Sequence, residues 1–409
     1  MSRLLARPLL AVMTACAAPG SPTPYSGAVQ SAADARLPPQ ISEPAELGWQ
    51  RPLASPRPSW PQDSLLQRLA EVCGEHDQAL SDAASRIALR QAHRQPPLDG
   101  LDLGLLLWSK GAPYVWPRTW SLSGRSLEPS RAIDSFARWL SRRYDGGVRR
   151  CGLARARNGS EDVVAAVAVD VLGDLVRPLS VRATSGQWVS FEAQMLVEAT
   201  AAKVVVLGPT RAPFTVPTQM EGGQVRARFC VDRPGRWVAQ LLVLVEGGVR
   251  PVLEAPIYVD RLPPTLSDST RAEAPLEEPA AADPEATLIR MLNQARQAAG
   301  LAPLAVDPRL AAAADRHARW MMRTGQLGHQ SDQGDPRQRV RAAVPDSLHE
   351  GENVATARTL VRAHRVLLAS PSHRGNLLDR RYDSVGVGVA RDESGSLWVC
   401  ELFSDRDGW

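Results

Sequence analysis

Residues 351–355 read Gly-Glu-Asn-Val-Ala, and residues 370–379 read Ser-Pro-Ser-His-Arg-Gly-Asn-Leu-Leu-Asp. Further signals flank these two segments: Gly328-His329, residues 334–340 with the sequence Gly-Asp-Pro-Arg-Gln-Arg-Val, and residues 385–389 with the sequence Val-Gly-Val-Gly-Val. Each segment alone is a weak signal, because short motifs of small and polar residues occur in many folds. Their order and spacing together are specific.

In that order the segments resemble the bacterial branch of the CAP superfamily, the cysteine-rich secretory, antigen 5 and pathogenesis-related proteins. The resemblance covers residues 285–405. It implies an α-β-α sandwich, with helices on both faces of a small antiparallel sheet whose last strands are expected at 384–390 and 397–403. Function has to be argued from the site, because one fold can carry many functions.

Helix signals in the same region agree with this fold. Apolar residues recur at helical spacing from Leu288 to Arg296, and Gly300 supplies a stop signal. Asp307 can cap a second helix, with Pro308 in the first helical position. His317 falls on the apolar face of that helix, which predicts a hydrogen-bonded core histidine.

The family resemblance implies a ligand groove at three positions of this sequence: His329, Glu352 and His373. The fourth groove position of many relatives, a second glutamate, falls near Ser370 here. Its absence weakens the expectation of an enzyme-like site.

Two imidazoles and a carboxylate can hold a divalent transition metal, and zinc is the expected ion, with His329 and His373 as ligands. A bound ion could activate water, with Glu352 as the candidate catalytic base. The alternative is that the histidines and Glu352 hydrogen-bond one another and line a polar groove.

The preferred functional hypothesis is a surface-displayed module that binds an extracellular small hydrophobic molecule or a cell-envelope polymer. One alternative is a metal-dependent hydrolase acting on peptide or envelope substrates, and another is a non-catalytic structural envelope protein. Whether the protein is an enzyme stays open, with a non-enzyme favoured.

The N-terminus is typical of an export signal. Arg3 and Arg7 are followed by the apolar residues 8–13 and then by small residues. Residues 13–16, Met-Thr-Ala-Cys, resemble a lipobox, which predicts acylation of Cys16 and an extracytoplasmic, membrane-anchored protein. The alternative is ordinary signal cleavage nearby and secretion.

The remaining cysteines would lie in an oxidising compartment. We expect a disulfide between Cys73 and Cys151, which fall in one predicted domain, and buried strand thiols at Cys230 and Cys400.

Changes in composition along the chain divide it into several segments and predict an α+β multidomain protein. Export signal residues 1–16 precede a linker rich in Pro, Ser, Ala and Gly at 17–60, and a second linker covers 261–284. Residues 61–172 are helix-rich. Valine-rich runs separated by Gly and Pro at 173–260 predict an immunoglobulin-like β-sandwich, whose core we expect to contain Trp188 and Trp237.

An internal similarity joins the two ends of the folded region. Residues 142–145 and 380–383 both read Arg-Arg-Tyr-Asp, and an apolar strand pattern follows each. Residues 61–172 are therefore interpreted as a degenerate second CAP-like domain. The aromatic-rich run at 113–120 is expected to pack in a core, with a carbohydrate-binding face as the alternative.

The distribution of charge argues against a nucleic-acid partner. The net charge is +4, and the basic residues are spread along the chain without a dense block. We therefore expect no nucleic-acid partner.

Overall fold

The computed structural model describes residues 63–142, 146–210, 212–246, 248–264 and 283–405, together with the backbone of strand β1 (Gly48–Trp49). The predicted export signal with Cys16, most of both linkers and part of the first Arg-Arg-Tyr-Asp motif lie outside the described residues. Within these ranges, no helix is long and apolar enough to cross a membrane.

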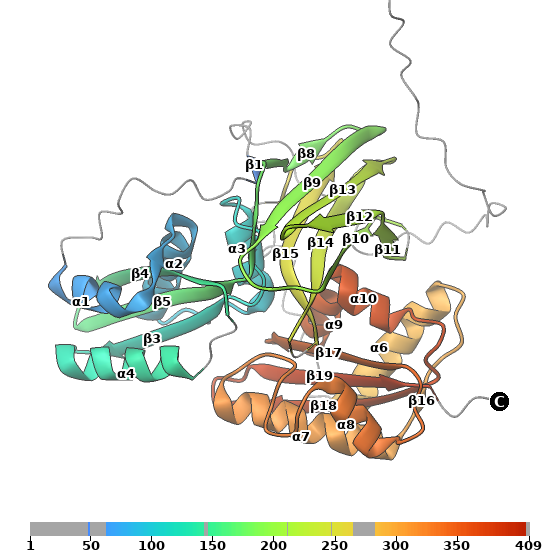
Figure 1. Ribbon diagram of the computed structural model, residues 1–409. Helices are drawn as coiled ribbons and strands as arrows, with labels where there is room; N and C mark the ends of the chain where they lie inside the picture. The colour runs from blue at the N-terminus through green and yellow to red at the C-terminus, as the bar shows by residue number, and fades with distance from the viewer. Residues whose placement is uncertain are drawn as a thin grey trace, which may run out of the picture.

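The N-terminal unit, residues 63–171, is a four-stranded sheet in the order β2-β4-β5-β3 with helices on both faces (Figure 1). Successive residues of β5 face opposite sides, as in any strand: Val164 and Ala166 join a core with α1 and α4, whereas Val167 and Val169 join a core with α2 and α3. Its elements are α1 (Ser64–Cys73), β2 (Glu75–His76), α2 (Gln78–Ala92), α3 (Gly100–Trp108), β3 (Arg118–Gly124), α4 (Pro129–Ser141), β4 (Val148–Asn158) and β5 (Glu161–Val171).

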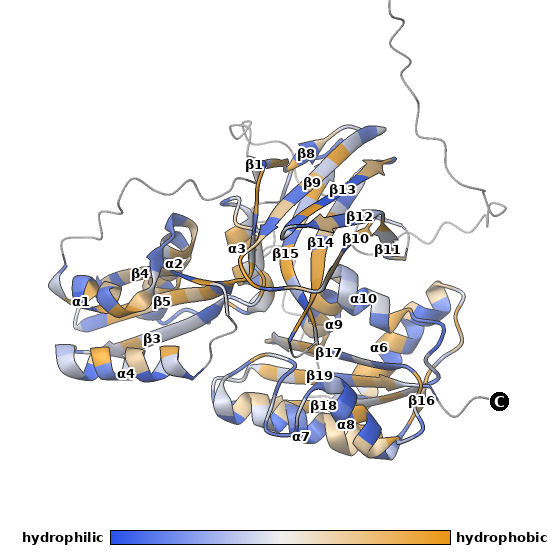
Figure 2. Cartoon of the chain, viewed as in Figure 1, coloured by the Kyte–Doolittle hydropathy of each residue, from blue (hydrophilic) through white to orange (hydrophobic). Residues whose placement is uncertain are grey.

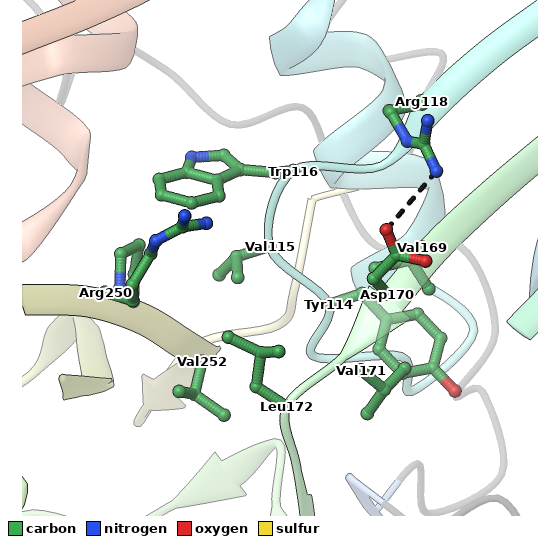
Figure 3. Close-up of a pocket in the computed structure, with 11 residues that line it drawn as sticks. Tyr114, Val115, Trp116, Arg118, Val169, Asp170, Val171, Leu172, Arg250 and Val252 are labelled. Atoms are coloured by element: carbon green, nitrogen blue, oxygen red, sulfur yellow. Dashed lines mark hydrogen bonds and ion pairs between the residues drawn. The ribbon is translucent and has the colours of Figure 1, made fainter. Parts of the chain in front are cut away.

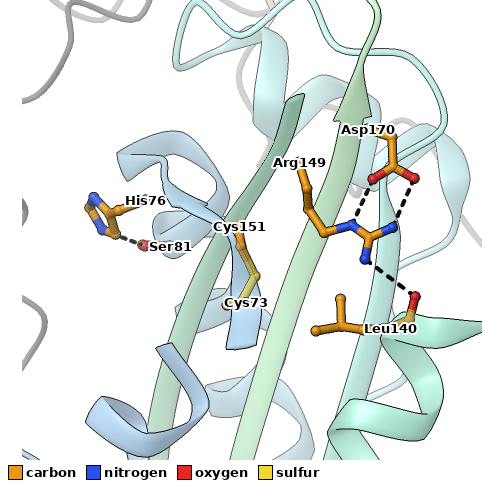
Figure 4. Close-up of a disulfide and its surroundings, with 7 residues drawn as sticks. All are labelled: Cys73, His76, Ser81, Leu140, Arg149, Cys151 and Asp170. Atoms are coloured by element: carbon orange, nitrogen blue, oxygen red, sulfur yellow. Dashed lines mark hydrogen bonds and ion pairs between the residues drawn. A yellow bond between two sulfur atoms is a disulfide. The ribbon is translucent and has the colours of Figure 1, made fainter. Parts of the chain in front are cut away.

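A disulfide crosses this unit. Cys73 at the end of α1 is bonded to Cys151 on β4, with 5.8 Å between their Cα atoms, as the sequence predicts (Figure 4). Beside it Arg149 donates a 2.7 Å hydrogen bond to Asp170. Cys230 is only half-buried, which corrects the expectation of a buried position. Cys400 is a buried free thiol, as expected.

The central unit, residues 173–260, consists of two sheets that share one hydrophobic core. A five-stranded sheet has the order β11-β10-β14-β15-β8 and a four-stranded sheet the order β12-β13-β9-β6, while β1 pairs with β7. The strands are β6 (Gly173–Leu175), β7 (Leu179–Ser180), β8 (Arg182–Ala183), β9 (Gln187–Met195), β10 (Ala201–Leu207), β11 (Phe214–Val216), β12 (Thr218–Glu221), β13 (Gln224–Val231), β14 (Gly235–Val245) and β15 (Gly248–Val259).

The core of the central unit is apolar along β14 and β15, where hydrophobic residues follow one another (Figure 2). Trp237 is 1% exposed and fills this core, as expected. Trp188 is 45% exposed, so its predicted core position is wrong. It lies on the outer face of β9, where Arg228 stacks over its ring. The immunoglobulin-like class of this unit and the predicted domain boundaries stay predictions.

The C-terminal unit, residues 283–405, is a four-stranded sheet in the order β16-β18-β19-β17. One face packs on α6, α9 and α10, and the other packs on α7 and α8. The elements are α6 (Pro284–Ala298), β16 (Ala305–Val306), α7 (Pro308–Thr324), α8 (Pro336–Ala343), β17 (Glu350–Ala357), α9 (Leu360–Ala369), α10 (Pro371–Leu377), β18 (Ser384–Arg391) and β19 (Leu397–Ser404).

Local sequence explains these boundaries. The Asp307 side chain accepts hydrogen bonds from the backbone N–H groups of Arg309 and Leu310, and Pro308 begins α7. Asp335 and Gln338 form a capping box at the start of α8. This helix places Arg339 in the protein interior, below β17.

Candidate functional site

Glu352 lies at the centre of a buried polar cluster. It projects from β17 toward α7 and α8, and its side chain is 1% exposed. The thiol of Cys400 lies 3.8 Å from Oε2, and Nε2 of His317 lies 3.9 Å from Oε1. A buried carboxylate needs compensating partners, since an unpaired charge in the interior is very costly.

Arg339 is the principal partner. Its Nη2 and Nε donate hydrogen bonds of 2.6 and 3.0 Å to Oε2 of Glu352. The same guanidinium donates to the backbone carbonyls of His329 and Gly334 and to the hydroxyl of Ser331. Arg339 therefore connects the loop that carries His329 to the strand that carries Glu352.

His329 is the hydrogen-bond partner of the other carboxylate oxygen of Glu352. Its Nδ1 lies 2.8 Å from Oε1 of Glu352, and its side chain remains 18% exposed. Burial alone would raise the pKa of Glu352, but the hydrogen bond from His329 and the positive charge of Arg339 hold it below its ordinary value. Glu352 is thus a carboxylate, and Nδ1 of His329 must donate to it.

His373 approaches this cluster from α10. It is half-buried, and its ring is close enough to His329 and Glu352 for both to influence its charge. Burial lowers the pKa of His373 to about 3, so the ring is neutral at ordinary pH. Among the described residues, Nδ1 of His373 has no hydrogen-bond partner.

Two asparagines attach α10 to β17. Nδ2 of Asn353 donates to the carbonyl of His373 at 3.2 Å, and Nδ2 of Asn376 donates to the carbonyl of Glu352 at 3.0 Å. These bonds fix the helix that carries His373 beside the strand that carries Glu352. The three positions implied by the family resemblance are therefore brought together.

Glu352 is not placed to be a metal ligand. Metal ligands direct lone pairs at a common point, whereas here Nδ1 of His329 and the guanidinium of Arg339 are directed at the two oxygens of Glu352. Within the described ranges, no group of His, Cys, Asp and Glu side chains is placed to hold a metal ion. Zinc binding at His329 and His373 stays a prediction.

Ser370, the expected place of a second glutamate, faces away from the cluster. Its hydroxyl donates a 3.1 Å hydrogen bond to Glu254 on β15, and Nε2 of Gln240 on β14 lies 3.3 Å from it. This position is therefore a contact between the C-terminal and central units.

Sequence reasoning did not assign roles to several residues of the cluster. Arg339 carried a signal, because it belongs to the segment at 334–340. His317 is buried as predicted, and its Nε2 lies 2.9 Å from the carbonyl of Gly328. Trp116 of the N-terminal unit carried no signal for this site, yet its ring lies 5.5 Å from the His329 ring in an edge-on arrangement.

Comparison with known proteins identifies the C-terminal unit. Residues 289–402 match the family model of the CAP domain, described as the cysteine-rich secretory protein family. No curated protein sequence matches the chain.

Similar solved structures include three bacterial proteins. An extracellular protein containing an SCP domain from Bacillus anthracis is 18% identical with a TM-score of 0.28, over 53% of this chain and 82% of its own. A cysteine-rich secretory protein from Staphylococcus aureus is 16% identical with a TM-score of 0.25, over 58% and 81%. An outer surface protein from Borrelia burgdorferi is 22% identical with a TM-score of 0.29, over 30% and 92%.

Proposed function

We propose, on the premise that residues 289–402 form a CAP domain, that this protein is an exported, non-catalytic binding protein of the cell envelope. Its ligand site is the groove around His329, Glu352 and His373. The ligand class we favour is an envelope polymer rich in hydroxyl and amide groups.

The hydrogen bonds that occupy both carboxylate oxygens of Glu352 are the main support for this proposal. A general base needs an oxygen directed at the proton that it removes. Oε1 of Glu352 faces His329 at 2.8 Å, and Oε2 faces Arg339 at 2.6 Å. Glu352 is therefore better suited to orienting His329 than to activating water, which favours binding over hydrolysis.

The histidines supply the polar contacts. Because Nδ1 of His329 donates to Glu352, its Nε2 is left as the second polar atom of a partly exposed ring. The neutral ring of His373 can donate from one nitrogen and accept at the other. Such a pair suits hydroxyl and amide groups, which both donate and accept hydrogen bonds.

A small hydrophobic molecule is the second candidate ligand. This class is the one that the family resemblance implies. The pocket beside Trp116, whose walls include Val115 and Asp170, has room for about one water molecule and does not support it (Figure 3). We propose export through residues 1–16, with Cys16 as the lipid attachment site in a membrane anchor.

The test is co-sedimentation of the full exported chain with insoluble peptidoglycan, and separately with phosphatidylglycerol vesicles. His373→Ala is the informative variant, because its side chain has no hydrogen-bond partner among the described residues and its loss should leave the fold intact. His93→Ala, at an exposed histidine of the N-terminal unit, is the matched control. We expect His373→Ala to bind at least about tenfold more weakly than the control.

The alternatives give different results. A structural envelope protein would bind equally well with His329→Ala/His373→Ala as with the native sequence. A hydrolase would release soluble fragments from peptidoglycan, and Glu352→Gln would abolish that release. Either result would refute the proposal.

A further inference from the structure

The N-terminal unit repeats the connectivity of the CAP domain. Its sheet order β2-β4-β5-β3 corresponds to β16-β18-β19-β17, and in both sheets the short first strand pairs parallel while the others pair antiparallel. The helix after the short strand begins in the same way. The backbone N–H of Asp77 donates to the carbonyl of Cys151 at 2.9 Å, and that of Asp307 donates to the carbonyl of Val385 at 3.0 Å.

Two glycines show which residues of the two units correspond. A Cβ on Gly152 would lie 2.0 Å from the carbonyl carbon of Leu80, and a Cβ on Gly386 would lie 2.1 Å from that of Leu310. Leu80 and Leu310 each follow the helix-capping aspartate by three residues. In both units the helix can approach the strand this closely only because a glycine faces it.

The N-terminal unit lacks the polar cluster. Glu352 pairs across β19 with Leu402, which pairs with Gly386. In the N-terminal unit, Gly152 pairs with Val167, and Val167 pairs with Thr119. An exposed threonine thus occupies the strand position of the buried glutamate, so this unit cannot form the same groove.

The loop before β3 instead reaches the polar cluster of the C-terminal unit at His329. Tyr114 is 4% exposed, and its hydroxyl donates a 2.5 Å hydrogen bond to Asp77 and accepts one of 3.2 Å from Arg150. The carbonyl of Pro113 accepts a 3.0 Å hydrogen bond from the backbone N–H of Glu254. The loop is therefore attached to both the N-terminal and the central unit immediately before Trp116.

Trp116 occupies an unusual position. Its φ of +52° lies in the left-handed region, which a bulky side chain rarely adopts and which points to a functional or packing demand. Arg250 of the central unit stacks over the Trp116 ring at 5.7 Å (Figure 3). The His329 ring lies 5.5 Å from the Trp116 ring. The indole thus stands between Arg250 of the central unit and His329 of the C-terminal unit.

We propose that the N-terminal unit, a copy of the CAP domain without its polar cluster, supplies Trp116 as an aromatic wall of the groove in the C-terminal copy. Trp116 is then a specificity-determining residue of a site built from both copies. This inference rests on the proposed binding function. The ligand it fits is one that presents a flat or apolar face toward the indole while its polar groups meet the histidines.

The test compares Trp116→Ala, Trp116→Phe and Trp188→Ala in the full chain. Trp188 is the matched control, because it is exposed on the central unit and also stacks with an arginine. Binding to insoluble peptidoglycan is expected to weaken about tenfold in Trp116→Ala, to recover largely in Trp116→Phe, and to stay unchanged in Trp188→Ala.

Histidine proton NMR of the same variants gives a readout without ligand. The Trp116→Ala change should shift the His329 ring resonance, which is assigned with His329→Ala, because the nearby indole ring is lost. Absence of that shift would show that the contact does not exist and would overturn the proposal.

The results separate the two proposals. If His373→Ala loses binding while Trp116→Ala binds as tightly as the native chain or more tightly, the wall is refuted and the proposed function stands. If the native chain binds no more peptidoglycan than the double variant His329→Ala/His373→Ala, the proposed function fails, and the wall fails with it.

Discussion

Arg362 on α9 of the CAP domain forms a buried ion pair with Asp99, the residue that caps α3 in the N-terminal unit. Nη2 of Arg362 donates to Oδ1 of Asp99 at 2.8 Å and to Oδ1 of Asp102 at 2.9 Å. Arg362 and Asp99 expose only 4% and 3% of their side chains. Burial alone would raise the pKa of Asp99, but Arg362 holds it below its usual range. This pair joins the unit that carries Trp116 to the unit that carries His329.

Removal of this cation should separate the two units. Arg362→Ala leaves two buried aspartates with the more exposed Arg358, at 3.7 and 3.3 Å, as a cation partner, and loss of one member of a buried pair costs about 3 kcal/mol. We expect a lower urea midpoint and a faster proteolytic cleavage between the units. Arg381→Ala is the control, because Arg381 pairs with Asp379 at an exposed position and should contribute less than about 1 kcal/mol. Equal midpoints for the two variants would contradict a stabilising interface.

Glu401 makes the stability of the CAP domain depend on pH. It lies fully buried on β19, where Nδ2 of Asn353 donates to Oε2 at 3.0 Å, and Oε1 has no hydrogen-bond partner among the described residues. Burial raises the pKa of Glu401 to about 7, and the hydrogen bond from Asn353 offsets this only in part. The folded protein therefore keeps this carboxyl protonated in a range where the unfolded chain releases the proton.

The sign of the effect follows from linkage. Because the folded pKa is raised above the unfolded value of 4.5, the contribution of Glu401 is most favourable below about pH 4.5 and declines as the pH rises to about 7. Glu401→Gln removes this dependence and should be more stable than the native chain at pH 8, by an amount on the order of 2 kcal/mol. Thermal unfolding from pH 4 to 8 measures it. Glu393→Gln, at an exposed position, is the control, and a constant difference between Glu401→Gln and native across this range would refute the prediction.

Much of the C-terminal fold could be predicted from local sequence. The caps at Asp307 and Pro308 and the stop at Gly300 are interactions within a few residues, so they determine helix ends without knowledge of the rest of the fold. The strands that the family resemblance implied at 384–390 and 397–403 agree with β18 and β19. Trp188 was misplaced because an amphipathic strand shows which residues share a face, but a large aromatic residue can lie on either face.

The candidate site was only partly predictable. His329, Glu352 and His373 follow from the family motifs, and the structure brings them together. Trp116 contacts His329 across a separation of more than half the chain, and that contact depends on how whole units dock. Ser370 belongs to the same motif as His373, yet it faces Glu254 because the residue that precedes α10 lies against the central unit. Local patterns contain no information about such contacts.

The paired glycines give the most direct test of the internal repeat. Gly152→Ala and Gly386→Ala each place a Cβ about 2 Å from helix backbone atoms, at Leu80 and Ser81 in one unit and at Leu310 and Ala311 in the other. Because backbone cannot move aside as a flexible side chain can, we expect each variant to lose more than about 3 kcal/mol of stability or to fail to fold. Gly375→Ala in α10 is the control: a Cβ there meets no atom within 4 Å, and alanine should stabilise the helix by up to about 1 kcal/mol. Soluble yield and thermal midpoints distinguish the cases. If Gly152→Ala behaves like Gly375→Ala while Gly386→Ala is disrupted, the N-terminal helix does not approach its strand as the CAP helix does, and the two units are not copies of one fold.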